Sequence, residues 1–445
     1  MRSGLFWRRS GAAAGFYVSA ALGFLGTTVI AANAFSAQVF GLYAIVLAAA
    51  GFCQSFLDLT VEEALIKFGF RYQTREDWGR LRRLFSRALL VKLVGALLAA
   101  GALLLLAPLA SSVFGRSGLE RPLAIAALLP LAQFCEGPAG VALILRGRYD
   151  LRSYFLVVSM ALRLGGIAVG SRFGLWQTIL GMVVAQVVAT SAISVAGRLA
   201  FSRYPRASVR PLGEDRRGIL SFVLQSSAAS GVTSLTTPLA TLVLGAVASP
   251  LQAGWFRLAQ SPQQALASLS APVRIILLTE QTRDWERGTR QTVFAGIRRY
   301  TLGAVLIGLV LLPPVIWLAP HLIRIFFGGT KNLGATNAMR LLLVAAGLRF
   351  VYGWTKSFPV SIGRPKLRIW THGLETAVLI PLTAAFGSFW GASGAAVAVI
   401  CSALAYCAYW TFLFLRIRRE PSTQEVVDVS SAELETAAAE AEALA

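Results

Sequence analysis

The sequence predicts an all-α integral membrane protein with about 12 transmembrane helices, arranged in two six-helix lobes. Of its 445 residues, 56% are hydrophobic and only 14% are charged, which is too apolar for a soluble domain of this length. Apolar runs of roughly 20 residues, long enough to cross about 30 Å of hydrocarbon as a helix, recur along the chain. Lipid offers no partners to unpaired backbone groups, so runs of this length must be helices.

Glycine, proline and charged residues divide the apolar runs into individual spans. The first run is predicted to be a span and not a cleaved signal peptide, because it has no small-residue cleavage site. The spans are expected at about 11–34, 40–63, 88–110, 122–145, 152–171, 175–197, 218–247, 251–273, 300–320, 337–361, 367–387 and 391–415.

The positive charge of the chain indicates how it is oriented in the membrane. A net charge of +21 would suggest a nucleic-acid partner in a soluble protein, but here the cations lie in short loops between spans, and no nucleic acid is expected. With the N-terminus inside, 31 of the 42 Lys and Arg residues fall on the cytoplasmic side. Both termini are therefore predicted to be cytoplasmic.

The two halves of the chain resemble each other in sequence. Six spans per half give two parallel repeats, with a substrate site expected between them. The predicted parts are an N-terminal lobe (1–200), a basic linker (201–217), a C-terminal lobe (218–417) and an acidic tail (418–445) expected to be disordered. The matching segments are Gly41–Tyr43 with Gly254–Phe256, Leu106–Pro108 with Leu318–Pro320, and Gly147–Arg152 with Gly363–Arg368.

The eighth span contains the first candidate binding residue, Arg257. A charge at mid-helix costs about 2.5–3.5 kcal/mol on insertion scales and must face a partner, water or an anion. Gln260 and Gln264 follow at helical spacing and share its face. A polar face in the seventh span either packs helices together or lines the same cavity, and it includes Ser230, Thr233 and Thr237.

The fifth and tenth spans add further cations. Arg349, Tyr352 and Lys356 follow one another at steps of three and four residues, so we expect two cations and a phenol hydroxyl on one helix face. Arg163, in the middle of the fifth span, either joins this cavity or pairs with Glu136. Mid-membrane cations therefore outnumber acids.

Other charged residues lie nearer the predicted membrane surfaces. Lys92 is close enough to a span end to extend to the surface. At the cytoplasmic mouth, Asp58 and Glu62 of one half and Arg274 of the other form a candidate gate that closes when they pair; alternatively the acids only offset the neighbouring basic loop. The His372–Glu375 pair is either a local polar contact or a proton site.

No catalytic or metal site is evident in the sequence. The cysteines (Cys53, Cys135, Cys401 and Cys407) lie in predicted spans without metal-ligand spacing. We find no paired carboxylates and no nucleophile with a base, so neither an enzyme nor a cofactor is expected.

At Gly41–Ala44, and again at Ala253–Gln260, the chain resembles the polysaccharide exporters of the MOP (multidrug/oligosaccharidyl-lipid/polysaccharide) superfamily, over about residues 10–417. The resemblance implies a MATE-like fold with a central cavity between the lobes. It implies a flippase in the bacterial inner membrane that carries an undecaprenyl-pyrophosphate-linked oligosaccharide from the inner to the outer leaflet. Arg257 matches the cation of the family's second-half motif. A glycan polymerase and glycosyltransferases are the implied partners, and a monomer is expected.

Two other functions remain open from the sequence. A multidrug or cation antiporter of the same superfamily would favour a carboxylate-rich cavity, which the excess of cations argues against. A membrane-embedded polysaccharide polymerase or ligase would need a large external loop with catalytic groups, whereas the longest outer segment, 321–336, contains no acidic residue.

Overall fold

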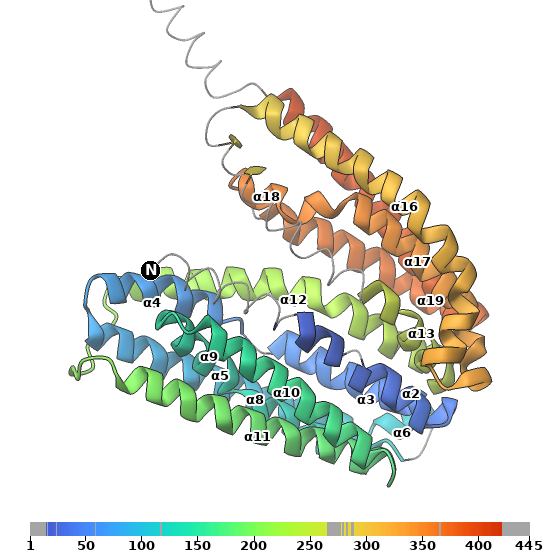
Figure 1. Cartoon of the computed structure of the whole chain (residues 1–445), viewed down its shortest axis with the longest axis horizontal. Coiled ribbons are helices and arrows are strands. Elements are labelled where there is room, and N and C mark those ends of the chain that lie inside the picture. The colour runs from blue at the N-terminus through green and yellow to red at the C-terminus, as the bar shows by residue number, and fades with distance from the viewer. Residues whose placement is uncertain are drawn as a thin grey trace, which may run out of the picture.

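The predicted fold class, an all-helical membrane protein with two lobes, is confirmed. The computed structural model describes residues 15, 17–23, 25–57, 59–115, 118–264, 277, 280–281, 284–285, 289–364 and 366–420, with the backbone alone at 25–27, 229, 230, 233 and 360. This part of the chain forms helices and turns without strands. Figure 1 shows two groups of helices that meet at the right and diverge towards the left, giving a V.

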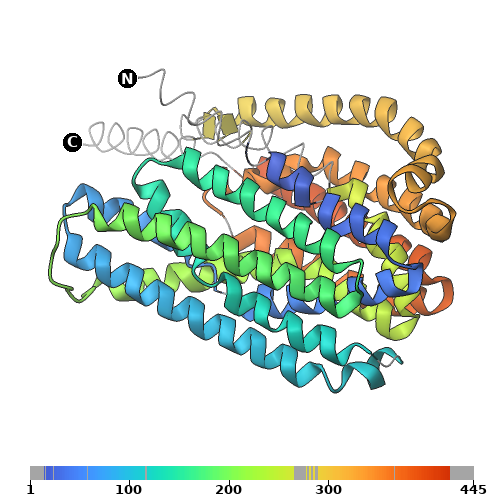
Figure 2. The ribbon, with the colours of Figure 1, turned by 60° about the horizontal axis from the view of Figure 1, so that its bottom comes forward.

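The first lobe contains the helices of the N-terminal half, with the long helices α10 and α11 side by side (Figure 2). Its elements are η1 (Leu25–Ile30), α2 (Ala31–Ala34), α3 (Ala37–Leu57), α4 (Glu62–Thr74), α5 (Trp78–Leu106), α6 (Ala110–Phe114), α7 (Glu120–Ala126), α8 (Leu128–Gln133), α9 (Glu136–Leu145), α10 (Tyr149–Gly170) and α11 (Leu175–Ser202).

The second lobe contains the helices of the C-terminal half, of which α12 runs along the lower group of helices in Figure 1. Its elements are α12 (Asp215–Val247), α13 (Pro250–Ala259), α16 (Arg290–Phe326), η2 (Gly329–Ala335), α17 (Thr336–Val351), η3 (Gly353–Lys356), α18 (Phe358–Ser361) and α19 (Lys366–Arg419). Eight helices of the described chain are long and apolar enough to cross a membrane. The domain boundaries at 200, 217 and 417 stay a prediction, and the tail beyond residue 420 lies outside the described residues.

The last two predicted spans are both contained in α19, which reverses direction at Gly391. This glycine has φ +58° and ψ −134°, a conformation that side-chain-bearing residues rarely adopt. The ring of His372, before the turn, lies 5.2 Å from the ring of Tyr406, after it, so the two halves run antiparallel. Gln252 of α13 accepts a hydrogen bond from the backbone N–H of Ala392 (2.8 Å) and fixes the turn.

The repeated Gly-Arg-x-x-Leu-Arg segments form the same helix-ending turn in each half. Gly147 and Gly363 adopt left-handed φ angles of +69° and +71°. The next residue in each case donates its backbone N–H to the carbonyl five positions earlier: Arg148 to Leu143 (2.9 Å) and Arg364 to Pro359 (2.8 Å). This is the Schellman arrangement, in which glycine avoids a steric penalty. The conserved geometry supports the repeat inferred from sequence.

The second predicted span ends earlier than expected. Helix α3 stops at Leu57, and α4 begins at Glu62. Between them, the backbone N–H of Thr60 donates to the hydroxyl of Ser227 on α12 (2.8 Å). A side chain of the other lobe thus replaces the helical hydrogen bond that this donor has lost, and the chain can bend here at little cost.

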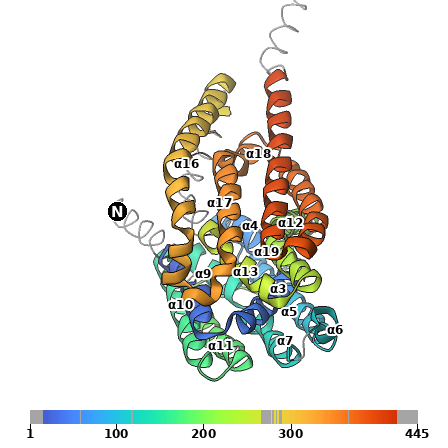
Figure 3. The same ribbon diagram turned by 90° about the vertical axis from the view of Figure 1, so that its right-hand side faces the viewer.

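The two lobes touch through the glycines that sequence comparison paired. Helices α3 and α13 lie side by side between the lobes (Figure 3). A Cβ at Gly254 would lie 2.8 Å from the Cα of Gly41, and a Cβ at Gly41 would clash with the backbone carbonyl of Pro250. Only glycine allows two helix backbones to approach so closely. The repeats therefore meet at equivalent positions, as expected at an axis that relates them.

A second contact joins the lobes at the end predicted to lie outside the cytoplasm. Lys331 Nζ donates to the carbonyls of Asn33 (2.8 Å) and Phe35 (2.7 Å). In return, Asn33 Nδ2 donates to the carbonyl of Phe326 (2.7 Å). These bonds close the V at its right-hand end in Figure 1, while the opposite end diverges. With the predicted orientation, this is an inward-facing arrangement.

We expect Gly41→Ala and Gly254→Ala each to destabilise the protein by about 1–3 kcal/mol, because the obstructing atoms are backbone and cannot move aside. Thermal unfolding in detergent, followed by fluorescence-detected size exclusion, measures the effect. Gly101→Ala, on α5, is the matched control, since a Cβ there meets nothing within 4 Å. Equal melting temperatures for all three variants would contradict the close crossing.

We expect Lys331→Met to shift the balance of lobe conformations towards an open outer end by about tenfold, since it removes charge-assisted hydrogen bonds between the lobes. Spin labels at Ser112 and Asn337, one in each lobe, report the distance by pulsed electron resonance. Arg324→Met removes a nearby charge that bonds to no described residue and should leave the distance distribution unchanged. An unaltered distribution in Lys331→Met would show that these bonds do not hold the lobes together.

Candidate functional site

Four of the predicted binding residues meet in one cavity of the C-terminal lobe. The cavity has a volume of about 180 Å³ and lies among α12, α13 with the turn that follows it, α17 and α19. Leu379 and Val399 provide its apolar lining. Its polar lining consists of Thr236, Thr237, Gln260, Gln263, Gln264 and Arg349.

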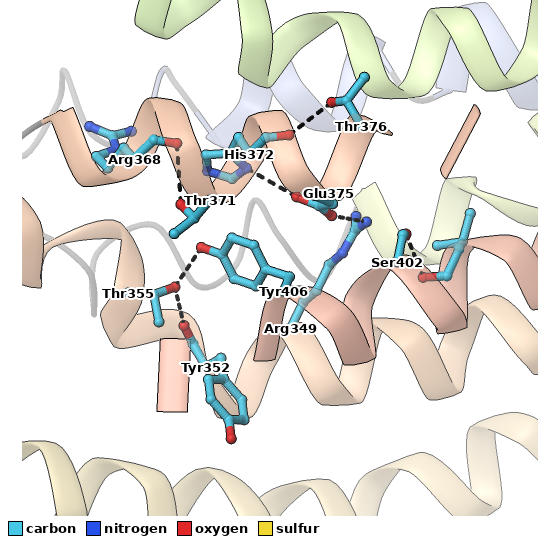
Figure 4. Close-up of polar contacts among 11 residues, drawn as sticks. Arg349, Tyr352, Thr355, Arg368, Thr371, His372, Glu375, Thr376, Ser402 and Tyr406 are labelled. Atoms are coloured by element: carbon cyan, nitrogen blue, oxygen red, sulfur yellow. Dashed lines mark hydrogen bonds and ion pairs between the residues drawn. The ribbon is translucent and has the colours of Figure 1, made fainter. Parts of the chain in front are cut away.

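Arg349 reaches the cavity from the end of α17 and is neutralised there. Its Nη2 lies 2.5 Å from Oε1 of Glu375 on α19 (Figure 4). The second carboxylate oxygen of Glu375 contacts Nδ1 of His372, one helical turn earlier, at 3.0 Å. Glu375 is 7% exposed, so both of its oxygens are used within the protein. The guanidinium therefore contributes hydrogen-bond donors to the cavity but little net charge.

Tyr352 and Lys356 do not share the face of Arg349, contrary to the expectation. Helix α17 ends at Val351, and Lys356 is an exposed residue at the end of the 3-10 turn η3. The Tyr352 hydroxyl bonds to Thr411 (2.8 Å) and points away from Arg349 in Figure 4. The expected shared face required an uninterrupted α-helix from Arg349 to Lys356, and the helix ends before Tyr352.

Arg163 and Arg257 come together between the lobes, beside Tyr43. Arg163 is on α10 of the first lobe and Arg257 on α13 of the second, and both interact electrostatically with the hydroxyl of Tyr43 on α3. This hydroxyl donates to the sulfur of Met182 (3.7 Å) and is fully enclosed. Within the described residues neither arginine forms an ion pair, and Arg163 Nε is buried without a hydrogen-bond partner.

The two alternatives for Arg163 stay predictions, because it interacts electrostatically with both Tyr43 and Glu136 and does not line the C-terminal cavity. Glu136, the other candidate partner, accepts a hydrogen bond from Gln186 Nε2 at 2.6 Å, and Gln186 also donates to Thr190 (3.1 Å). Glu136 acts on Arg163 only through longer-range electrostatics. Two cations from different lobes thus lie near one phenol, without a carboxylate bound to either of them among the described residues.

A second cavity, of about 320 Å³, lies within the N-terminal lobe and was missed by sequence analysis. Lys92 Nζ and Glu62 Oε1 form an ion pair across 2.8 Å. The prediction that Lys92 extends to the membrane surface is wrong, since the residue is only 6% exposed. The polar lining consists of Gln54, Glu62, Lys92, Gln133, Glu136 and Arg152.

One pair of repeat-equivalent residues lines the two cavities. An offset of 216 residues aligns Gln133, which lines the N-terminal cavity, with Arg349, which lines the C-terminal one. Glu136 also lines the first cavity, but its counterpart Tyr352 does not line the second.

The remaining predicted residues stay untested. Thr237 lines the C-terminal cavity, whereas the side chains of Ser230 and Thr233 lie outside the described residues. So do Asp58 and Arg274, two members of the candidate gate. Glu62, the third, faces Lys92 within the N-terminal lobe.

The sequence matches one described protein family. A sequence model of the polysaccharide biosynthesis protein family covers residues 12–275, more than half of the chain. Among curated proteins, no sequence matches.

Three solved structures of similar shape are distant in sequence. Lipid II flippase MurJ, in an inward closed conformation, has a TM-score of 0.71 at 14% identity, over 92% of this chain and 88% of that one. An inward-facing multidrug resistance MATE family transporter of the MOP superfamily has a TM-score of 0.67 at 13% identity, over 94% and 100%. A MOP superfamily transporter from Pyrococcus furiosus, described as having a binding pocket of reverse polarity, has a TM-score of 0.60 at 14% identity, over 92% and 95%. At these identities the likeness shows the fold, which is that of the MOP superfamily.

We expect Lys92→Met to destabilise the protein by about 3 kcal/mol, because it leaves Glu62 in the cavity without its partner. The double variant Lys92→Met/Glu62→Gln should recover part of this loss. Chemical or thermal unfolding in detergent measures both. Arg148→Met is the control, because it breaks a half-exposed ion pair with Asp150 in the same lobe and should cost less than about 1 kcal/mol. If Lys92→Met and Arg148→Met behave alike, the buried pair contributes no more than a surface one.

Proposed function

Since the chain belongs to the polysaccharide biosynthesis protein family, we propose that it is a flippase for an undecaprenyl-pyrophosphate-linked oligosaccharide or a related polysaccharide precursor. It is a multi-pass membrane protein. We place it in the bacterial inner membrane as a monomer with both termini in the cytoplasm, next to glycosyltransferases and a glycan polymerase. The observation on which the proposal rests is the pair of arginines, one from each lobe, beside Tyr43.

The chemistry of these arginines fits a lipid pyrophosphate. A cation inside a membrane protein is costly unless an anion or water compensates it. Neither Arg163 nor Arg257 has a carboxylate partner among the described residues, so the compensating charge can come from a ligand. Guanidinium groups bind phosphate oxygens through paired, charge-assisted hydrogen bonds. Two guanidinium groups match the two phosphate groups of a pyrophosphate.

The arrangement of the lobes supports alternating access. The outer ends are joined through Lys331 and Asn33, and the ends predicted to face the cytoplasm diverge, so a headgroup made in the cytoplasm can enter. Rocking of the lobes about the contact between Gly41 and Gly254 would then open the other side. Because Arg163 and Arg257 belong to different lobes, an anion that binds both links substrate binding to the relative position of the lobes.

A multidrug or cation antiporter is the second candidate, and the fold likeness to MATE transporters is the observation that favours it. A cationic substrate would be attracted by free carboxylates. In the N-terminal cavity, however, Glu62 pairs with Lys92 and Glu136 accepts from Gln186. The two charges that lie beside Tyr43, Arg163 and Arg257, are positive and have no ion-pair partner in the described chain, and this supports an anionic cargo. A polymerase or ligase would need a catalytic group beside the bound glycan, and we assign no residue to such a role.

We expect Arg163→Gln and Arg257→Gln each to slow flipping by roughly 10- to 100-fold, since a hydrogen bond to a charged group is worth about 1.5–3 kcal/mol. The assay uses proteoliposomes containing an undecaprenyl-pyrophosphate oligosaccharide and a membrane-impermeant reagent that modifies the glycan in the outer leaflet.

Arg172→Gln, at the exposed turn between α10 and α11, is the charge-matched control and should flip normally. Wild-type rates in both interface variants would refute the arginine site. Proton-driven uptake of ethidium by the same vesicles, together with no glycan flipping, would favour the antiporter.

A further inference from the structure

The cavity of the C-terminal lobe lies directly beside the arginine proposed to hold the pyrophosphate. Arg257 and Gln260 are three residues apart, and the backbone remains helical between and beyond them, with Gln260 N–H bonded to Phe256 and Gln264 N–H bonded to Gln260. Three residues of helix rise about 4.5 Å. A ligand group attached to a phosphate at Arg257 is therefore within reach of Gln260.

The cavity has a ligand-sized space and an unsatisfied acceptor. Its volume of about 180 Å³ corresponds to roughly six water molecules, which is the scale of one monosaccharide ring. Gln260 is 6% exposed, and its Oε1 is buried without a hydrogen-bond partner in the described structure. An orphaned acceptor in a cavity costs free energy until a ligand or water donates to it.

The lining requires a ligand that both donates and accepts hydrogen bonds. Gln260 Oε1 needs a donor, whereas the guanidinium of Arg349 can only donate and therefore needs acceptors. A phosphate or carboxylate only accepts. A sugar hydroxyl does both, and glutamine and threonine are suited to bind it.

The charge balance favours a neutral ring. Arg349 is the charged residue of the lining, and Glu375 already neutralises it, with His372 holding the other carboxylate oxygen. The other groups that interact electrostatically with Glu375 are Lys356 of η3 and, on the second half of α19, Tyr406 and Cys407. Glu375 is thus a positioning residue, which fixes Arg349 as a neutralised donor. A uronic acid would have to compete with Glu375 for the same guanidinium.

We infer that the cavity among Thr237, Gln260 and Arg349 binds the first, pyrophosphate-proximal sugar of the lipid-linked substrate as a single neutral ring. This inference rests on the proposed function, because it assumes that the pyrophosphate binds at Arg257. The C-terminal lobe would then recognise the sugar while both lobes hold the phosphates.

The test compares three probes in proteoliposomes: undecaprenyl pyrophosphate alone, the same lipid carrying one neutral hexose, and the same lipid carrying one hexuronate. Wild-type protein should flip the hexose probe faster than the other two. Gln260→Leu should lower the hexose-to-bare-lipid ratio roughly three- to tenfold, since it removes one hydrogen bond to the sugar. Gln177→Leu is the matched control, because its amide oxygen is also buried without a partner but lies on α11, outside the cavity.

Glu375→Gln is an independent test, in which selectivity between the sugar probes should rise and not fall. Removing the carboxylate leaves the charge of Arg349 available, so the hexuronate-to-hexose ratio should rise roughly tenfold. If Gln260→Leu keeps the wild-type ratio, or if wild-type protein flips all three probes equally, the sugar site is refuted while the flippase stands. If wild-type protein flips none of them above empty vesicles, the proposed function itself fails. If Glu375→Gln does not fold, the comparison of Gln260→Leu with wild-type protein still tests the sugar site.

Discussion

The close approach of α3 and α13 at Gly41 and Gly254 is the contact on which the other features of this structure depend. In a membrane, helices gain little from the hydrophobic effect when they associate, so close packing of backbones has to supply the affinity. The two glycines allow that packing at one point, and polar contacts such as Lys331 with Asn33 and Tyr72 with Asp215 join the lobes elsewhere. The same crossing brings Tyr43 of α3 next to Arg257 of α13, because each lies two or three residues beyond its glycine.

Charge is distributed differently inside the lobes and between them. Each lobe contains a buried ion pair: Lys92 with Glu62 in the first, and Arg349 with Glu375 in the second. Breaking such a pair would leave one charge uncompensated at a cost of several kcal/mol, so these pairs stabilise a rigid lobe. Between the lobes, the arginines beside Tyr43 bind no carboxylate of the described chain. A rigid, neutral interior and a cationic interface are what a transporter of anionic lipid headgroups needs if its lobes rock as units.

Each lobe contains a cavity, and the two differ in chemistry. Gln133 of the first cavity corresponds by position to Arg349 of the second. The first cavity holds a closely paired lysine and glutamate, and the second is lined mainly by amides and hydroxyls, with an unsatisfied acceptor at Gln260. The side chains at equivalent positions of the repeat have therefore diverged.

The sequence by itself determined the fold class, the repeat and the positions of its turns, because span length, charge bias and left-handed glycines are local properties of the chain. Gly147 and Gly363 could be paired from sequence since a helix end needs the same local geometry wherever it occurs. Tertiary structure decided which charges meet. Arg349 was expected to share a helix face with Tyr352 and Lys356, but the helix stops at Val351 and Arg349 pairs with Glu375. Arg163 and Arg257 are far apart in sequence on helices of different lobes, and only the packing of those helices brings both of them to Tyr43.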